Sequence, residues 1–422
     1  MNLSLSDEQL EFQRHCHRFA VEVLRPVADH HDREQSVPWE VIREARAWGL
    51  HGLDLLQRIG ADHDGLLGVI YAEELNWGCA GLALAISASG LAAAGIAASG
   101  TPAQIARWVP ECFGLGDEIK VGAYAVSEAG AGSDVKALRT RAVRDGDEWI
   151  LNGAKLWISN GGIADVTVVV ATVDPELGHR GQASFIVPKG APGLSQGKKE
   201  DKLGIRASQT AEVVLQDCRI PLDHVLGGIE KLERKLERAR QGARAGSSNA
   251  LATFEVTRPM VGACAIGVAR AAYEYTLELL EGRDELGGPL LEQQRVQEVL
   301  ADVATEIDAA RLLVWRAAWM GRNGQPMTAA QGSMSKLKGG DVAMWATTTL
   351  MDLVGREAST YDHPLQKFFR DAKIFQIFEG TAQIQRLVVA RMQVAEHRRR
   401  RAEALGDADA EAAALASAPS AP

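Results

Sequence analysis

Apolar and polar positions divide the chain into three successive blocks. The first and last blocks repeat apolar residues at helical spacing, whereas the middle block has short apolar runs typical of strands. We therefore expect an α+β multidomain protein. Its parts are an N-terminal α-helical domain over 1–118, a β-barrel-like middle domain over 119–228 and a C-terminal four-helix bundle over 253–400.

Start signals, turns and periodicity locate individual elements within these blocks. The predicted helices are Asp7–Val23, Pro38–Ala47, Asp64–Glu74, Pro102–Val109, Val268–Leu280, Gln293–Met320 and Gln383–Val394. The predicted strands are Glu148–Leu151, Val166–Val173, Ala183–Val187 and Ala211–Leu215. Glycine after Asp or Asn favours hairpin turns, which we expect at Asp145-Gly146, Asn152-Gly153 and Asn160-Gly161-Gly162.

Three segments stand outside this pattern. Gly81–Gly100 is uncharged and long enough to span a bilayer, but it consists mostly of Ala, Gly and Ser, which predicts a buried helix and no membrane span. Residues 229–252 are predicted to be a charged and flexible insertion. Its Glu230–Arg244 part either binds phosphates or forms a solvated charged helix. The Ala-rich tail over 401–422 is expected to be disordered.

Composition narrows the class of protein. The chain has 46 Lys and Arg against 55 Asp and Glu, a formal charge of −9, which argues against a nucleic-acid partner and leaves acidic small ligands open. Its five cysteines are few and widely spread, so we expect reduced thiols in a cytoplasmic protein without a signal peptide. His15, Cys16 and His17 point in different directions on a helix, so we expect no metal site.

A glycine-rich block over 124–134 is the first segment with candidate chemistry. Gly130 and Gly132 allow the backbone to approach a flat or phosphorylated ligand, and Ser127 and Ser133 offer short donors. Neither a Walker loop nor a complete dinucleotide fingerprint is present. The same residues also fit a simple turn at a domain boundary.

Two further blocks carry a tryptophan and a glutamate. In a strand, Trp157 and Ser159 point to one face and suit an aromatic heterocycle with polar edges, although Trp157 also fits a core position. Glu379 follows an apolar run, and Gly380-Thr381 reads as a break before a helix capped by Thr381. A carboxylate in apolar surroundings has a raised pKa and can act as a general base. The alternative is a solvated glutamate at a helix end.

These blocks and their order resemble the acyl-CoA dehydrogenase family of flavoproteins, from Leu5 to about Val394. Four motifs carry the resemblance: Tyr-x-Val-Ser-Glu-x-Gly-Ala-Gly-Ser-Asp at 124–134, Asn-Gly-x-Lys-x-Trp-Ile-Ser-Asn-Gly at 152–161, Lys-Leu-Gly-Ile-Arg at 202–206 with Asp-Cys-Arg-Ile-Pro at 217–221, and Arg-Asp-Ala-Lys-Ile…Glu-Gly-Thr-x-Gln-Ile-Gln at 370–385.

The resemblance implies roles at the matching positions. It places Glu379 as the catalytic base. FAD contacts are implied for Tyr124, Val126, Ser127, Gly132, Ser133, Trp157, Ser159, Arg283, Gln294, Gly355, Thr381 and Gln383, with those at 283, 294, 381 and 383 reaching across a subunit contact. Substrate contacts are implied for Ser133, Glu255, Arg258, Phe378 and Gly380, with Ser133 on the path of the pantetheine arm.

The implied reaction is the α,β-dehydrogenation of an acyl-CoA thioester to a trans-2-enoyl-CoA in fatty-acid β-oxidation. Electrons would pass to an electron-transfer flavoprotein, and the family suggests a homotetramer. Some members carry the base just before the arginine, which here is Thr257; Glu255, two positions earlier, would face elsewhere on a helix. A carrier-protein thioester as substrate and a partner-subunit role remain alternatives.

The chain departs from the family pattern before the base helix. The usual Gln-x-x-Gly-Gly-x-Gly reads Asp-Leu-Val-Gly-Arg-Glu-Ala over 352–358, so only Gly355 is retained. Asp352 and Glu357 would repel a phosphate, whereas Arg356 would compensate. The contacts that hold FAD at this segment are therefore expected to differ from those usual in the family.

Overall fold

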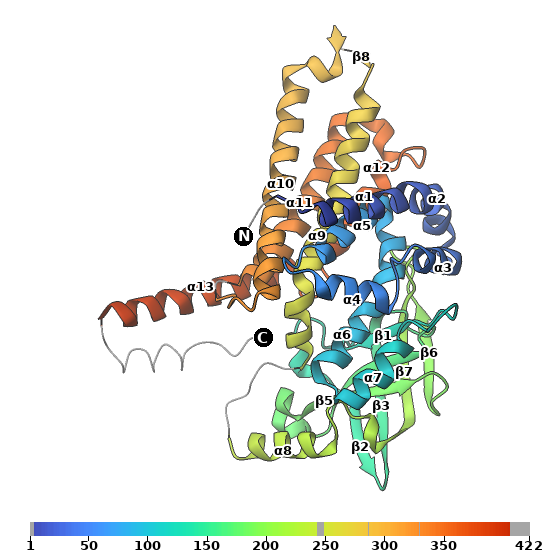
Figure 1. Cartoon of the computed structure of the whole chain (residues 1–422), viewed down its shortest axis with the longest axis vertical. Coiled ribbons are helices and arrows are strands. Elements are labelled where there is room, and N and C mark those ends of the chain that lie inside the picture. The colour runs from blue at the N-terminus through green and yellow to red at the C-terminus, as the bar shows by residue number, and fades with distance from the viewer. Residues whose placement is uncertain (1–3, 243–248, 286, 329, 406–422) are drawn as a thin grey trace.

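The expected sequence of helical, β and helical domains is confirmed (Figure 1). A computed structural model describes residues 4–242, 249–285, 287–328 and 330–405, with side chains for all of these except 249–256 and 405. Parts of the predicted insertion and most of the predicted disordered tail lie outside these ranges. Within them, the middle domain is a curled sheet set against helices from both ends of the chain.

The N-terminal domain is built from helices that follow the predicted start signals. Ser6 caps the first helix through a reciprocal pair of hydrogen bonds with Gln9, and Thr101 caps α7 in the same way with Gln104. The helices are α1 (Asp7–Phe19), α2 (Arg25–Glu34), α3 (Trp39–Ala47), α4 (Leu53–Ala61), α5 (Leu67–Ser87), α6 (Ser89–Ser99) and α7 (Pro102–Glu111), with a π-helical turn, Ala20–Leu24, between α1 and α2.

Helices α5 and α6 contain the uncharged segment, and they are packed through small residues as predicted. A Cβ added at Gly81 would lie 3.1 Å from Ala207, and one at Gly95 would lie 2.6 Å from the Tyr124 ring. In the described part of the chain, no single helix is both long and apolar enough to cross a membrane; α5 and α6 meet those criteria only as a pair, bent by 49°.

The sheet of the middle domain has the strand order β1-β4-β2-β3-β7-β6, with β5 paired to β4. The strands are β1 (Gly122–Ala125), β2 (Arg141–Asp145), β3 (Glu148–Ser159), β4 (Val166–Thr172), β5 (Gln182–Pro188), β6 (Leu194–Lys199) and β7 (Thr210–Pro221). The predicted strand positions are confirmed, but β1, β2 and β6 were not predicted. Strand β6 carries mostly exposed residues, and β1 has only four.

Two of the three predicted hairpins are wrong. Asp145-Gly146 does join the antiparallel strands β2 and β3. Asn152-Gly153 instead lies inside β3, where Gly153 sits beside a register shift against β7 and a Cβ would lie 2.4 Å from Thr140 Oγ1. Asn160-Gly161-Gly162 is a turn, but β4 pairs in parallel with β1 and does not return along β3.

The charged segment forms a helix, α8 (Ile229–Arg240), which packs against the sheet domain (Figure 1). Leu232 and Ala239 are the buried residues of this helix. The helix interpretation is therefore confirmed over these residues, and 229–240 is ordered where the sequence suggested a flexible insertion. Gly246, Ser247 and Ser248 lie outside the described residues.

The helices of the C-terminal domain are α9 (Asn249–Leu280), α10 (Gln294–Arg322), α11 (Gln331–Val354), α12 (Leu365–Ala372) and α13 (Ala382–Leu405), with a two-stranded tip formed by β8 (Asp284–Glu285) and β9 (Gly288–Pro289). The long helices α9, α10 and α11 pack side by side, whereas α13 projects away from them (Figure 1). Glycines let α9 and α11 approach closely, because a Cβ on Gly339 would lie 2.7 Å from the Gly262 carbonyl oxygen. Helix α11 was not predicted.

Candidate active site

Glu379 lies in a tight turn between the short helix Lys373–Gln376 and α13. Its φ is +53° and that of Gly380 is +94°, so two successive residues adopt left-handed backbone conformations. A side chain other than glycine at 380 would lie 2.5 Å from Gln385 Nε2. A left-handed glutamate is uncommon and requires support from its surroundings.

That support comes from two buried side chains. Lys336 on α11 is 1% exposed and donates to the Gly380 carbonyl oxygen at 2.7 Å. The Gln385 amide donates to the carbonyl oxygens of Glu379 and Gly380 at 3.1 and 3.2 Å. Residues from α11 and α13 thus fix the backbone of the turn, and with it the direction in which the Glu379 side chain points.

The carboxylate of Glu379 faces α9. Its Oε2 accepts a hydrogen bond from the Thr257 hydroxyl at 2.5 Å. Burial raises the pKa of Glu379, and the Thr257 bond and the charges of Lys336 and Arg258 oppose that rise in part. The result is a carboxylate held in place with a raised pKa.

The cations near this carboxylate are themselves withdrawn from water. Burial lowers the pKa of Lys336 to about 8, although the charge of Glu379 raises it in part. Arg258 is buried and donates to the Ser333 hydroxyl at 3.2 Å. The Cys264 thiol also lies close enough to be affected, since burial and then the charge of Glu379 raise its pKa to about 12.

The glycine-rich block and the tryptophan block meet at the end of β1. Lys155 is fully buried and donates to the Val126 carbonyl oxygen at 2.9 Å and to Glu128 at 2.8 Å. The Leu156 amide donates to the Ser127 carbonyl oxygen at 2.9 Å. The two motifs therefore lie side by side, with the Lys155–Glu128 ion pair between them.

Trp157 has a conformation that the sequence did not suggest. It lies at an irregularity in β3 with a φ of +63°, and its side chain is 61% exposed. It therefore does not occupy a core position. Ser127 and Ser159 nearby are partly exposed, whereas Tyr124 and Val126 are buried. An exposed indole beside hydroxyl groups fits a flat aromatic ligand with polar edges.

Several of the remaining predicted positions lie in loops and turns or near the tip of the C-terminal domain. Gly132 and Ser133 are exposed in the loop after β1, and Phe378 packs edge-on against Phe375 beside the Glu379 turn. Arg283 lies near the tip of the C-terminal domain, where it pairs with Glu285 and with Glu357 of the altered segment. It therefore lies beside the altered segment over 352–358, which contains Gly355.

The other predicted positions are on helix starts. Gln294 begins α10 and bonds Glu298 on the same helix. Thr381 caps α13 by accepting from the Ile384 amide, as predicted, and Gln383 in the first turn is exposed. The side chain of Glu255 lies outside the described residues. The described residues contain no group of three or more His, Cys, Asp or Glu that could hold a metal ion.

Three side chains that bond Glu379 or Gly380 were missed in the sequence. Thr257 was noted only as the position of an alternative base, and Lys336 and Gln385 were not singled out. Thr257 and Lys336 are distant in sequence from the groups they contact, whereas Gln385 lies on the helix that directly follows the Glu379 turn. The available signal for Lys336 was a pair of lysines, Lys336 and Lys338, in a run of α11 that is rich in small residues.

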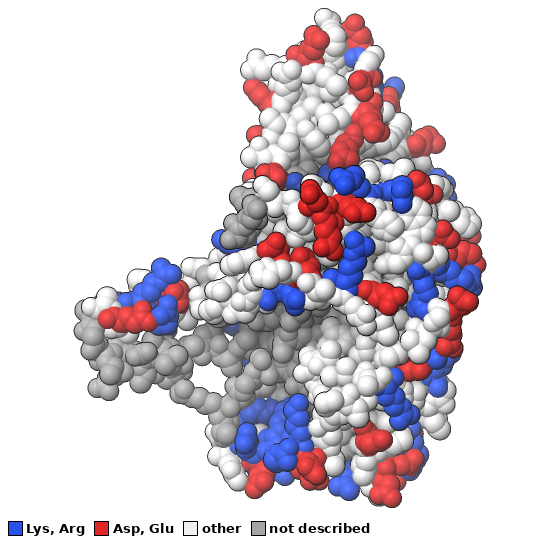
Figure 2. Space-filling model, in the orientation of Figure 1, with Lys and Arg blue, Asp and Glu red and all other residues white. Residues whose placement is uncertain are grey.

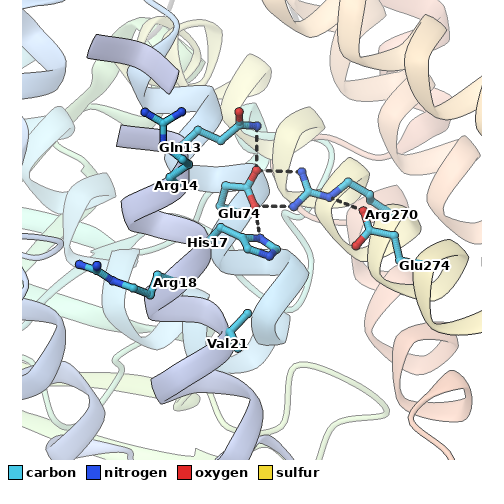
Figure 3. A pocket seen from close by; sticks show the side chains of 8 residues that line it. All are labelled: Gln13, Arg14, His17, Arg18, Val21, Glu74, Arg270 and Glu274. Carbon is cyan, nitrogen blue, oxygen red and sulfur yellow. Dashed lines mark hydrogen bonds and ion pairs between the residues drawn. The ribbon is translucent and has the colours of Figure 1, made fainter. Parts of the chain in front are cut away.

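A second buried carboxylate lies in a separate hollow between α1, α5 and α9 (Figure 3). Glu74 is bonded by Gln13, by His17 at 2.9 Å and by Arg270 through both of its terminal nitrogens. Burial alone would raise the pKa of Glu74, but these hydrogen bonds lower it to about 2. Figure 3 shows Arg14 and Arg18 pointing away from it. This group ties three helices together.

The fold and the site together define a class of oxidoreductase with a sheet domain between two helical domains. Family models of acyl-CoA dehydrogenases match all three parts: the N-terminal domain over residues 6–114, the middle domain over 123–218 and the C-terminal domain over 244–394. The chain belongs to the acyl-CoA dehydrogenase family, whose members are FAD-dependent oxidoreductases.

Individual relatives are similar along most of their length. The mitochondrial short-chain specific acyl-CoA dehydrogenase of Rattus norvegicus is 35% identical over 391 residues, covering 92% of this chain and 90% of the relative. The structure of butyryl-CoA dehydrogenase from Megasphaera elsdenii has a TM-score of 0.82 at 34% identity, covering 92% and 99%. A structure described as the electron transferring flavoprotein of Acidaminococcus fermentans has a TM-score of 0.82 at 32% identity, covering 93% and 99%.

Proposed function

We propose that this protein oxidises a short-chain acyl-CoA thioester to the trans-2-enoyl-CoA, with Glu379 removing the α-proton. The observation that carries this proposal is the Glu379 turn. It holds a carboxylate of raised pKa in one direction, with its hydrogen-bond partner and the supporting cation supplied by the same chain. A general base needs this combination of position and pKa.

The residues around β1 and β3 would hold the flavin. Trp157 offers an exposed aromatic face, Ser127 and Ser159 offer hydroxyl groups, and Tyr124 and Val126 are buried in β1 and directly after it. Arg283, Gln294, Gly355, Thr381 and Gln383 would contact FAD in an assembled homotetramer. When bound, FAD supplies the acceptor for the hydride that leaves the β-carbon.

The chain's own residues would carry out the proton step. The Glu379 carboxylate takes the proton from the α-carbon while the thioester oxygen gains negative charge. The backbone N–H of Glu379 would donate to that oxygen and stabilise the enolate. Gly132 and Ser133 would lie along the pantetheine arm, and Arg258, Phe378 and Gly380 would line the thioester end.

Similarity to short-chain and butyryl-CoA dehydrogenases supports a short acyl chain. The similarity to a structure described as an electron transferring flavoprotein supports such a protein as the partner in electron transfer. We infer both the electron acceptor and the homotetramer from membership of the family.

Anaerobic titration of the purified protein with acyl-CoAs of increasing chain length tests this function. We expect bound flavin to lose its absorbance with butyryl-CoA and less readily with longer chains. A yellow protein that no acyl-CoA bleaches, but a carrier-protein thioester does, would contradict the proposed substrate. A protein purified without flavin, and unable to take it up, would instead favour the role of a partner subunit.

A further inference from the structure

A thiol and an amine meet in the interior, where the N-terminal and C-terminal helical domains pack together. Cys79 on α5 is 1% exposed, and Lys367 on α12 is 6% exposed. Lys367 Nζ lies 3.2 Å from Cys79 Sγ, although the two residues are 288 positions apart in the chain. Neither side chain takes part in the reaction proposed above. Figure 2 shows only the outer face of the molecule, and this pair lies beneath such a surface.

Both groups are held in place by their surroundings. Helix α5 is interrupted at Cys79, whose backbone is extended with a φ of −166° and a ψ of 118°. Lys367 also donates to Asp371 Oδ2 at 2.5 Å, one turn further along α12. Asp371 Oδ1 in turn accepts from the Ile205 amide at 2.6 Å. The amine is therefore fixed between a thiol and a carboxylate that is itself anchored.

This arrangement supplies the groups that an oxidative crosslink needs. Hydrogen peroxide converts a cysteine to a sulfenic acid, which reacts further with a sulfur or nitrogen nucleophile beside it. A direct S–N bond would require Cys79 Sγ and Lys367 Nζ to approach far more closely than 3.2 Å. An oxygen atom between them requires only a small shift. The observed separation therefore favours the product that retains an oxygen atom.

We propose that Cys79 and Lys367 form a reversible sulfur–oxygen–nitrogen crosslink when the protein is exposed to hydrogen peroxide. The first peroxide takes two electrons from sulfur, so that the thiol becomes a sulfenic acid and one water leaves. The second takes two electrons from nitrogen. The O–H bond of the sulfenic acid and one N–H bond break, an N–O bond forms, and two waters leave. One thiol, one amine and two peroxides thus give one S–O–NH link and three waters.

The amine must lose a proton before it reacts, and Asp371 is placed to accept that proton. Burial lowers the pKa of Lys367, but neighbouring charges, chiefly that of Asp371, raise it by more. Lys367 is therefore protonated at neutral pH, and its neutral fraction grows as the pH rises. The crosslink should accordingly form faster in more alkaline solution.

The crosslink would join the two helical domains of the chain. It ties α5 to α12, and α12 leads through the short helix Lys373–Gln376 to the Glu379 turn. Because it closes a loop of 288 residues, it also restricts the unfolded chain. The oxidised protein should therefore unfold at a higher temperature than the reduced protein.

Peptide mass spectrometry of the holoenzyme tests the proposal directly. After peroxide treatment and digestion without a reductant, the Cys79 and Lys367 peptides should appear as one species. Its mass should equal the sum of the two peptides plus one oxygen atom and minus two hydrogen atoms. Two molecules of dithiothreitol should then reduce the link to thiol, amine and one water. The yield of the linked species should increase with pH.

Two serine variants provide the controls. Cys79→Ser retains the size of the side chain but removes the sulfur, so no linked species should form. Cys112 is as deeply buried, but its thiol bonds the Trp108 carbonyl oxygen and no amine, so Cys112→Ser should form the Cys79–Lys367 link like the wild type. Peroxide-treated wild type should unfold at roughly 5 °C above Cys79→Ser treated in the same way.

Recovery of Cys79 as a free thiol, or as a sulfinic acid with no lysine attached, would overturn the proposal. So would a linked species that forms only after the protein has been unfolded in denaturant, because the contact in the folded protein would then not be its cause. Neither result depends on which thioester the enzyme oxidises.

Discussion

Glu379 and Glu74 are both carboxylates withdrawn from water, yet their pKa values move in opposite directions. Glu74 receives both terminal nitrogens of Arg270 as well as His17 and Gln13, and its pKa falls to about 2. Glu379 receives one hydroxyl, and its nearest lysine bonds the adjacent carbonyl oxygen instead, so burial dominates and raises its pKa. The contrast shows that the partners of a buried carboxylate decide whether it is a structural anion or a base.

The largest effect is expected from Glu379→Gln. The amide cannot accept a proton, so kcat should fall by about 10³-fold or more. Because a carboxyl group with a raised pKa destabilises the folded state above that pKa, the variant should unfold at the same or a higher temperature. Turnover assays and thermal unfolding, each normalised to bound FAD, give both values. Activity near that of the wild type would exclude Glu379 as the base.

Arg270→Met should affect stability and leave the base intact. Leaving Glu74 buried without its main partner should lower the free energy of unfolding by about 3–5 kcal/mol at neutral pH. The low pKa of Glu74 contributes stability above pH 4.5 in the wild type, and this contribution is lost as the pH falls towards 2. The stability of the variant should not show this decrease as the pH falls.

Denaturant titrations at several pH values measure this effect. The control is Arg33→Met, which removes an exposed pair with Asp29 and should cost less than about 1 kcal/mol. Equal costs in the two variants would mean that Glu74 does not depend on Arg270.

Lys336→Met removes the cation beside the base, and so tests how far that cation limits the rise in the pKa of Glu379. Without the ammonium group, the Glu379–Gly380 turn loses a hydrogen bond and the pKa of Glu379 rises further. We expect kcat to fall about tenfold and the acidic limb of the kcat/KM profile to move to higher pH.

The alkaline limb gives a second test of Lys336. Its pKa of about 8 predicts that wild-type activity declines as the pH rises through that value, because the ammonium charge is lost. The variant should lack this decline. Lys338→Met is the matched control, since Lys338 is two residues away on α11 and pairs with Glu306 at the surface. The same losses in both variants would point to damage to α11.

Thr257→Val should produce the smallest change. It removes the hydrogen bond to the carboxylate, so the pKa of Glu379 rises and the acidic limb moves upward by about one pH unit. At neutral pH the rate should fall about threefold, and Thr257→Ser should restore it. A pH profile of the serine variant that matches the valine variant would refute a role for this hydroxyl.

Much of the fold could be predicted because helix caps and apolar periodicity are local signals. The capped starts of α1 and α7 show this. Helix α11 escaped prediction because Gly332, Gly339 and Gly340 dilute its pattern, although the same glycines permit its close packing. The false hairpin at Asn152-Gly153 reflects a turn signal that long pairing with β7 overrides.

The candidate site was predicted in part for a related reason. Glu379, Trp157 and the serines lie in motifs, so the sequence identifies them. The side chains that bond the Glu379 turn lie outside these motifs. Lys336 lies 44 residues from Gly380, and Thr257 lies 122 residues from Glu379. Such partners depend on how α9, α11 and α13 pack, and no local pattern of residues encodes that packing.

The most direct measurement isolates proton abstraction from hydride transfer. Methylthioacetyl-CoA carries sulfur at the β position and therefore has no hydride to give, whereas its α-carbon still carries protons. Holoenzyme in D₂O should place deuterium at that carbon, as detected by mass spectrometry, and Glu379→Gln with the same bound FAD should not. Deuterium incorporation at equal rates by the two proteins would contradict the assignment of Glu379 as the base.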